Sequence, residues 1–172
     1  MPTAELSYQE AKELLIQAWG TLGSHWGINK TMAQIHALLL ISPESLTTEQ
    51  IMEELHISRG NANMNIRALM DWGLIHKTHK PGDRKEYFSS EKDMWEITRQ
   101  IARERRKREL QPVIKVLGQV ENIKDDRTAH TKELKQVTKE LKFLVGKADS
   151  FLNMVTGFDQ SRFFNFLLRL KK

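Results

Sequence analysis

Residues 46–75 read LTTEQIMEELHISRGNANMNIRALMDWGLI, and this stretch decides the fold. A helix is predicted from Thr47, because a threonine with Gln50 three residues later can form a capping box. A tight connection then leads to Ser58, a residue type that commonly opens a helix. This second helix is expected to stop near Gly73, since glycine is favoured just beyond a helix end. The pattern predicts a helix-turn-helix.

The next residues, 76–88, read HKTHKPGDRKEYF, and their period changes from helical to alternating. Two short alternating runs around the turn at Pro81-Gly82 predict a β-hairpin. Ahead of the helix-turn-helix, two more helices are expected at about 7–23 and 30–41, the second ended by Ser42-Pro43. This order of elements is that of a winged helix-turn-helix.

The second helix of the helix-turn-helix has an unusual outward face. Its inward positions follow the helical period and are expected to be Ala62, Ile66, Leu69, Met70 and Leu74. The outward face is assigned three asparagines, Asn61, Asn63 and Asn65, although asparagine is a mediocre helix former. Because Asn and Arg match the hydrogen-bonding patterns of adenine and guanine in the major groove, the helix is predicted to read DNA.

On this hypothesis the helix divides its contacts between bases and phosphates. The side chains expected nearest the bases are Asn61, Asn63, Met64 and Arg67. Ser58 and Arg59 are expected to meet phosphate, and the small Gly60 would let the helix N-terminus approach it closely. The alternative is a structural helix of odd composition.

The predicted hairpin carries a second basic cluster. Around its tip lie Lys77, His79, Lys80, Arg84 and Lys85. Such a wing can follow the DNA backbone and insert an arginine into the minor groove. Lys77, Lys80, Arg84 and Lys85 are therefore further candidate DNA-binding residues, the alternative being a charged edge that prevents aggregation.

The charge distribution also favours a polyanionic partner. The formal charge of the whole chain is +5. Residues 1–57 contain two basic and seven acidic residues, a net charge of −5, whereas residues 58–172 contain 25 basic and 15 acidic residues, a net charge of +10. The densest basic run, residues 99–109, has three interpretations: contact with phosphate, a position inside a dimer, or a solvated helix.

Helices are expected on both sides of the winged domain. After the hairpin, Ser90 with Asp93 is predicted to cap a long helix from near Glu91, and Pro112 is expected to kink it. An apolar stripe in the first helix comprises Ala11, Leu14, Leu15, Ala18 and Leu22. A stripe of heptad-like spacing near the C-terminus comprises Leu134, Val137, Leu141, Leu144, Ala148, Phe151 and Val155, and indicates helix-on-helix packing.

Residues 46–75 and 76–88 together resemble the winged-helix domain of the MarR superfamily. The SRGNxxMNIRxLxDWGLI pattern is most similar to the GbsR-like branch, and the resemblance covers roughly residues 25–92. It implies a dimeric transcriptional regulator with a recognition helix over about Ser58 to Trp72. It also implies that Arg84 of the Asp83-Arg84 pair enters the minor groove. Many members respond to small ligands, and some GbsR-like regulators are associated with choline and glycine-betaine metabolism.

The fold class expected is mainly α, a winged helix-turn-helix (three-helix core plus β-hairpin wing) with flanking dimerisation helices. Three regions are assigned: an N-terminal helix joining the dimer region (1–24), the DNA-binding domain (25–92) and a helical dimerisation region (93–172). The expected partners are double-stranded DNA with a roughly palindromic operator, a second copy of the chain, and a small-molecule effector of unknown identity. A cation cage of tryptophans is disfavoured, because Trp19, Trp26, Trp72 and Trp95 suit seams between helices better.

Other classes of protein fit less well. The chain has no cysteine, its six histidines form no metal-binding motif, and neither a P-loop nor a G-x-G-x-x-G motif occurs. We therefore expect no enzyme, no catalytic residues, no metal and no cofactor. With no long apolar run and a polar, acidic start, a cytoplasmic protein without membrane contact is expected. The main alternative is a winged-helix protein-interaction module; RNA binding is a weaker option, because the outward face lacks aromatic residues.

Overall fold

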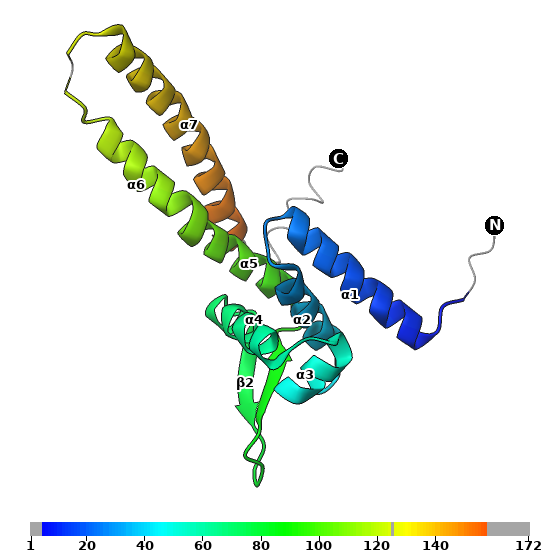
Figure 1. Ribbon diagram of the computed structural model, residues 1–172. Coiled ribbons are helices and arrows are strands. Elements are labelled where there is room, and N and C mark those ends of the chain that lie inside the picture. Colours follow the sequence, from blue (N-terminus) through cyan, green and yellow to red (C-terminus); the bar gives the residue numbers. More distant parts are fainter. Residues whose placement is uncertain (1–4, 125, 158–172) are drawn as a thin grey trace. The chain divides into compact units, whose positions relative to one another are not determined.

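The computed structural model describes residues 5–124 and 126–157, which fall into two compact units within Met1–Ile97 and Thr98–Lys172 (Figure 1). The helices of the first unit are α1 (Tyr8–His25), α2 (Lys30–Ile41), α3 (Thr48–Leu55) and α4 (Arg59–Asp71). Its strands are β1 (Leu46–Thr47), β2 (Ile75–His79) and β3 (Glu86–Ser90). The chain continues through α5 (Met94–Arg105) into a π-helical turn, η1 (Arg106–Leu110), and then α6 (Gln111–Val120) and α7 (Ala129–Gly157).

The starts of α1, α3 and α4 are set by the predicted caps, whereas α2 is capped by Asn29, which was not predicted. Ser7 and Glu10 form a capping box in which the Ser7 backbone N–H donates to Glu10 Oε2 at 2.9 Å. Thr47 and Gln50 form a second box, with the Thr47 N–H donating to Gln50 Oε1 at 2.8 Å. Between α3 and α4, His56 takes the left-handed conformation at φ 52°, which makes the connection tight.

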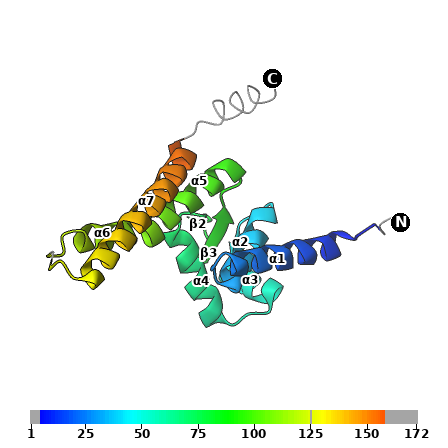
Figure 2. The same ribbon diagram turned by 90° about the horizontal axis from the view of Figure 1, so that it is seen from above.

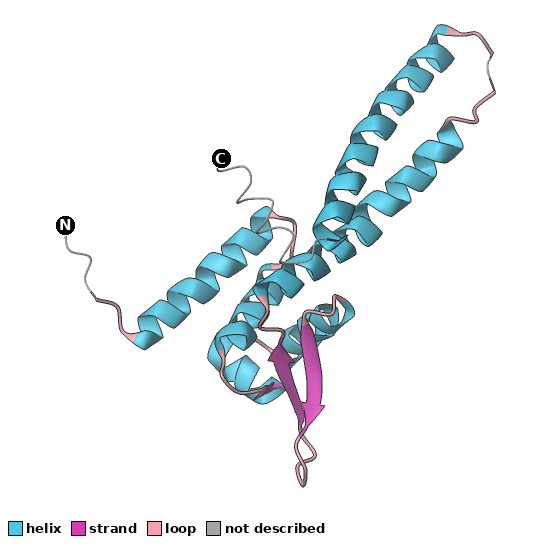
Figure 3. Cartoon of the chain, turned by 180° about the vertical axis from the view of Figure 1, so that it is seen from behind, coloured by secondary structure: helices cyan, strands magenta, loops and turns pink. Residues whose placement is uncertain are grey.

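The strands form an antiparallel sheet in the order β1-β3-β2. The hairpin of β2 and β3 occurs where the alternation predicts it, and Gly82 at its tip has φ +80°. Figure 3 shows this hairpin projecting beyond the helices of its unit. The sequence gives no sign of β1, because its two residues are too few to show a period; Leu46 pairs with Phe88 of the central strand.

The core of the first unit is built around α2, which is apolar on almost every side. Ile35, Leu38 and Leu39 are each at most 1% exposed, and Leu69 of α4 is 1% exposed. α1 lies close against α2, since a Cβ added at Gly23 would come within 2.6 Å of the Ala33 Cβ. This close packing fixes the scaffold on which α3 and α4 are held.

The predicted inward face of α4 is largely confirmed. Ala62, Ile66, Leu69 and Leu74 are buried, and Met70 is half-buried. The assignment of Asn65 to the outward face is wrong: its side chain is buried, with a residue exposure of 2%. On the helical wheel Asn65 lies about 40° from Leu69 and about 60° from Ala62, at the edge of the inward face, so its burial follows the helical period and not its polarity.

The start of α5 also differs from the prediction. The helix begins at Met94, and its cap is Asp93, whose Oδ1 accepts from the N–H of Trp95 at 2.8 Å. Ser90 is not a cap, because it ends β3 and its hydroxyl donates to the Leu74 carbonyl at 3.3 Å. The cap therefore lies three residues later than Ser90.

In the second unit, α6 and α7 lie side by side as an antiparallel pair (Figures 1 and 2). The disturbance expected near Pro112 takes the form of a π turn, in which the Gln111 N–H donates to the Arg106 carbonyl five residues back. Proline has no N–H to continue the α-helical pattern and crowds the preceding turn, which accounts for the irregularity there.

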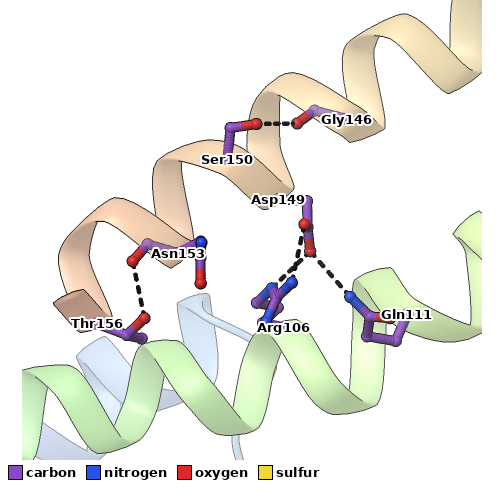
Figure 4. Close-up of polar contacts among 7 residues, drawn as sticks. All are labelled: Arg106, Gln111, Gly146, Asp149, Ser150, Asn153 and Thr156. Atoms are coloured by element: carbon purple, nitrogen blue, oxygen red, sulfur yellow. Dashed lines mark hydrogen bonds and ion pairs between the residues drawn. The ribbon is translucent and has the colours of Figure 1, made fainter.

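Polar residues join η1 and α6 to α7. Arg106 Nε and Nη2 donate to the two oxygens of Asp149 at 2.7 and 3.1 Å, and Gln111 Nε2 donates to Asp149 Oδ1 at 3.1 Å (Figure 4). The hydrogen bond from Arg106, aided by its charge, lowers the pKa of Asp149. Lys142 of α7 also pairs with Glu121 beyond the end of α6.

The heptad-like stripe on α7, which predicts helix-on-helix packing, is left exposed by the described chain. Its members Leu134, Leu141, Leu144 and Phe151 are 42–61% exposed. The less exposed residues of α7 belong to the neighbouring stripe, one position later along the chain: Thr138, Val145, Asp149 and Leu152. One residue turns a helix by about 100°, so the apolar stripe points to a different side.

The stripe on α1 behaves in the same way. Leu14, Leu15 and Leu22 are 43–61% exposed, whereas Ile16, Gly20 and Gly23 form the buried face against α2. Both terminal helices thus carry apolar side chains that the described chain does not cover. None of the helices among residues 5–124 and 126–157 combines the length and apolarity required to cross a bilayer.

Candidate nucleic-acid interface

Helix α4, the predicted recognition helix, presents its candidate base-reading residues at the surface. Asn63, Met64 and Arg67 are exposed, with Met64 at 59%, while Asn61 is half-buried. Ser58 caps the helix through a hydrogen bond from the Asn61 N–H to its Oγ at 3.3 Å. The open helix end and the exposed side chains lie on one element, as a helix in a major groove requires.

The first turn of α4 is less basic than the sequence indicates. Arg59 is exposed, but its Nη2 lies 3.0 Å from Glu49 Oε1 of α3. A contact of Arg59 with phosphate would compete with this exposed ion pair, which contributes at most about 1 kcal/mol. Gly60 is exposed, and a Cβ placed on it would meet nothing within 4 Å. The surface around Gly60 is open to a backbone approach.

The wing tip is ordered by a residue that the sequence reasoning did not select. Tyr87 donates its hydroxyl hydrogen to Asp83 Oδ2 at 2.7 Å, and the Lys85 N–H donates to Asp83 Oδ1 at 2.9 Å. The hydrogen bond from Tyr87 is the main cause of the lowered pKa of Asp83, and the same bond raises the pKa of Tyr87. Lys80 Nζ lies 4.4 Å from the centroid of the Tyr87 ring. The turn that carries Arg84 is thus held by the contacts of Asp83 with Tyr87 and Lys85, and by that of Lys80 with Tyr87.

The strands behind the tip carry a mixed charge cluster. Lys77 Nζ donates to Glu86 Oε1 at 2.8 Å, so one candidate phosphate-binding lysine is already paired. The Lys77 hydrogen bond is the main cause of the lowered pKa of Glu86, with smaller electrostatic contributions from His79 and Arg67. Arg67 of the recognition helix is therefore within the electrostatic reach of the wing.

A lysine after β3 ties the wing to the scaffold. Lys92 Nζ donates to the carbonyls of Leu39, Leu40 and Ser42 at 2.7–2.8 Å, which closes the C-terminal end of α2. In the core beside it, burial and the nearby Lys92 charge lower the pKa of His36 to about 4. The ring of Trp19 lies 6.3 Å from that of His36, so this tryptophan occupies the seam between α1 and α2.

The basic run at 99–109 is partly paired inside the second unit. Arg105 and Arg108 form ion pairs with Glu109 and Glu104, at 3.0 and 2.8 Å, and Arg106 pairs with Asp149. The buried Glu104 also lies 3.8 Å from Lys107. Much of this charge therefore has partners within the chain.

The second unit also holds a small basic cavity of about 270 Å³. Its lining residues are Arg103, Arg106, Lys107, Gln111 and Thr156. Figure 4 shows Arg106 and Gln111 bound to Asp149, with Thr156 farther along α7 beside Asn153. Across the part of the chain that the structure describes, no group of three His, Asp or Glu side chains could hold a metal ion.

Of the residues selected from sequence, the structure places Ser58, Arg59, Gly60, Asn61, Asn63, Met64 and Arg67 on α4 or at its cap, and Lys77, Lys80, Arg84 and Lys85 on the hairpin. Three residues that hold these side chains in place were not predicted from the sequence. Asn65 is hydrogen-bonded to Asn61, Tyr87 to Asp83 at the wing tip, and Lys92 to the end of α2. Tyr87 follows Asp83 by four residues across the tip, which is the one sign of its role in the sequence.

Comparisons with known proteins agree with this arrangement. Residues 26–86 match the sequence model of the MarR family. The HTH-type transcriptional repressor GbsR of Bacillus subtilis (strain 168) is 25% identical over 89 residues, which are 52% of this chain and 49% of that protein. The chain thus matches about half the length of this relative.

A solved structure titled as a crystal structure of a transcriptional regulator is similar in fold. It aligns with a TM-score of 0.57 at 20% identity, over 84% of this chain and 99% of the other. The family match covers α2, α3, α4 and most of the hairpin, the elements that build the winged helix. The winged helix of the first unit is therefore similar to that of the MarR family over residues 26–86.

Proposed function

We propose that this protein is a homodimeric transcriptional regulator that binds double-stranded DNA in a sequence-specific manner. The observation that carries the proposal is the pairing of an exposed Asn-, Met- and Arg-bearing face on α4 with a braced basic wing in a winged helix similar to that of the MarR family. The name of the Bacillus relative, a transcriptional repressor, supports regulation of transcription.

In this proposal α4 enters the major groove. Asn61, Asn63, Met64 and Arg67 lie nearest the bases, and Arg67 is suited to the two acceptors of guanine. The cap at Ser58, with Arg59 and Gly60, lies against phosphate. The wing follows the neighbouring backbone through Lys77, Lys80 and Lys85, and Arg84 enters the minor groove.

The exposed stripes support a homodimer. Leucine side chains that are 42–61% exposed along α7 cost free energy in water, and burying the exposed half of each against a second copy contributes about 1 kcal/mol. Similar side chains on α1 support its participation. A two-fold dimer would place two recognition helices on a roughly palindromic operator, with half-sites about one helical turn apart.

A small effector would act by changing the separation of the two recognition helices. The cavity in the second unit is the place we assign to it, because three of its five lining residues are Arg or Lys, two of which also face carboxylates, Arg106 that of Asp149 and Lys107 that of Glu104. An anionic effector fits such a lining. Binding that favours one separation of the recognition helices would shift the dimer toward or away from the operator-binding form.

The decisive experiment is selection of bound sequences from a random duplex library, followed by salt titration on the selected site. We expect a two-fold-related motif, and binding that weakens steeply with salt because phosphate contacts release counterions. The absence of salt-sensitive binding to any duplex would overturn the proposal. That outcome would favour a protein-interaction module that uses the exposed stripes on α1 and α7.

A further inference from the structure

Two asparagines near the start of the recognition helix form a hydrogen-bonded pair. Asn65 Nδ2 donates to the Asn61 backbone carbonyl at 2.9 Å and to Asn61 Oδ1 at 2.7 Å. Asn65 is 2% exposed, whereas Asn61 is half-buried in the first turn of α4. A buried residue thus holds the side chain of a candidate base-reading residue.

The backbone carbonyl fixes the orientation of both amides. A carbonyl oxygen only accepts, so the Asn65 atom that faces it must be the nitrogen and not the oxygen. The same nitrogen faces the Asn61 side chain, so the Asn61 atom that meets it must be Oδ1. An interchange of N and O in either side chain would set two donors or two acceptors against each other.

This orientation determines what Asn61 can offer to a base. Its oxygen is turned toward Asn65, and its Nδ2, which no hydrogen bond links to another described residue, is left as a pair of donors. Recognition of adenine by asparagine uses both edges of the amide, because Oδ1 must accept from N6 while Nδ2 donates to N7. Guanine presents two acceptors, N7 and O6, and suits a donor alone.

We propose that Asn65 is a positioning residue that turns Asn61 into a donor and makes it prefer guanine over adenine. The inference rests on the proposed DNA-binding function and adds the base read at one position. Asn63, two residues from each, supplies the internal contrast: it is exposed and keeps both amide edges for a base. Asn61 and Asn63 lie on the same helix but are expected to prefer different bases, because only Asn61 is hydrogen-bonded to Asn65.

The test uses the full-length protein and sequencing of duplexes selected from a random library. For the wild type we expect guanine to be favoured at the base pair whose preference is lost in Asn61→Ala. In Asn65→Ala the Asn61 amide is free to turn, so the ratio of guanine to adenine at that base pair should fall roughly fivefold or more. Asn63→Ala is the matched control and should flatten a different base pair.

A second variant guards against loss of folding. Asn65→Ser can still donate to the Asn61 backbone carbonyl but leaves Oδ1 without its partner, so it should change the base preference as Asn65→Ala does. Binding to random DNA should stay within twofold of wild type in both variants, and far-ultraviolet circular dichroism checks their helix content.

The outcomes separate this inference from the proposed function. A wild type that prefers adenine at the Asn61 base pair, or an unchanged preference in folded Asn65→Ser, would overturn the role of Asn65 while DNA binding stands. A loss of affinity with no change in base preference would make Asn65 merely structural. A wild type that enriches no sequence would contradict the proposed function itself.

Discussion

The two units treat their amphipathic helices in opposite ways. In the first unit, α4 turns its apolar face inward, with Leu69 at 1% exposure, and presents its polar face to the surface. In the second unit, α7 packs a face that includes Thr138 and Asp149 against α6 and η1, and leaves its leucines exposed. One apolar face is closed by the chain itself, and the other is open.

The comparison teaches that an apolar stripe shows that a face is made for packing but does not identify what packs there. Within α4 the local chain supplies the partner, since α2 and α3 lie against it. On α7 the stripe that contains Asp149 already has an intramolecular partner through Arg106 and Gln111. The apolar stripe then remains for another molecule, and a second copy is the partner we propose.

The largest effect is expected when the exposed apolar stripe of α7 is disrupted. Replacing Leu141 and Leu144 by glutamate should weaken self-association by about 3–6 kcal/mol, because two side chains that would be buried in the dimer become charged. Light scattering over a range of concentrations measures the mass. Lys139→Glu, on an exposed site of the same helix, is the control, and a dimer that persists in the double variant would refute the open-face interpretation.

The buried apolar face of α4 is tested with Leu69→Ala. This change should lower the free energy of unfolding by about 2–5 kcal/mol, because it removes a fully buried side chain and leaves a cavity. Urea denaturation gives the value. Met64→Ala on the outward side of the same helix should change stability by no more than about 0.5 kcal/mol. Similar losses in both variants would show that the two faces of α4 are not distinct.

The buried His36 makes the closed core sensitive to acid. Its pKa in the folded chain is about 4, whereas an unfolded histidine titrates near 6.5, so between these values the unfolded state binds more protons. The free energy of unfolding should be highest above pH 6.5 and should fall by about 3 kcal/mol as the pH drops to 4.

Urea denaturation at several pH values measures this dependence. His36→Leu keeps a side chain of similar size without a titrating group and should flatten the curve across that window. The same slope in His36→Leu would assign the acid sensitivity to other groups.

Substitutions on the outward side of α4 should change the affinity for DNA and leave the free energy of unfolding unchanged. We expect Arg67→Ala to cost about 1–3 kcal/mol in binding to the selected operator and to relax its sequence preference. Fluorescence anisotropy on operator and random duplexes compares the two. If both duplexes lose affinity equally, Arg67 does not read bases.

The smallest change is expected at the wing. Arg84→Ala should weaken binding and reduce the slope of log affinity against log salt by about 1, as one cationic contact is lost. Arg108→Ala removes a charge from the basic run and serves as the control, with an unchanged slope expected. A slope that falls in the control and not in Arg84→Ala would move the DNA contact from the wing to the basic run.

Much of the fold was predictable from sequence because its signals are local. The capping boxes at Ser7 and Thr47, the stop at Ser42-Pro43 and the Pro81-Gly82 tip each act within a few residues, and each lies where predicted. The wrong assignment of Asn65 followed its polarity and not the helical period. Which stripe of α7 meets α6 could not be predicted, because it depends on partners remote in sequence.

The candidate site was predictable to the same degree. Exposed residues of α4 and the wing follow from the helical and strand periods. Their supports do not, because the Tyr87–Asp83, Asn65–Asn61 and Lys92–α2 contacts depend on how side chains meet in the folded chain. The sequence indicated which residues would reach a ligand but not which residues would hold them in place.

Because of the π turn at Arg106–Leu110, a change of one residue in the length of this region changes the rotation of the helix that follows. Deleting one codon there would restore the α-helical spacing and turn the following helix by about 100° relative to the preceding turn. Asp149 of α7 could then no longer bind both Arg106 of the turn and Gln111 of α6. The connection between α6 and α7 is not bound to a helical phase, so insertions and deletions should be tolerated there and selected against at the turn.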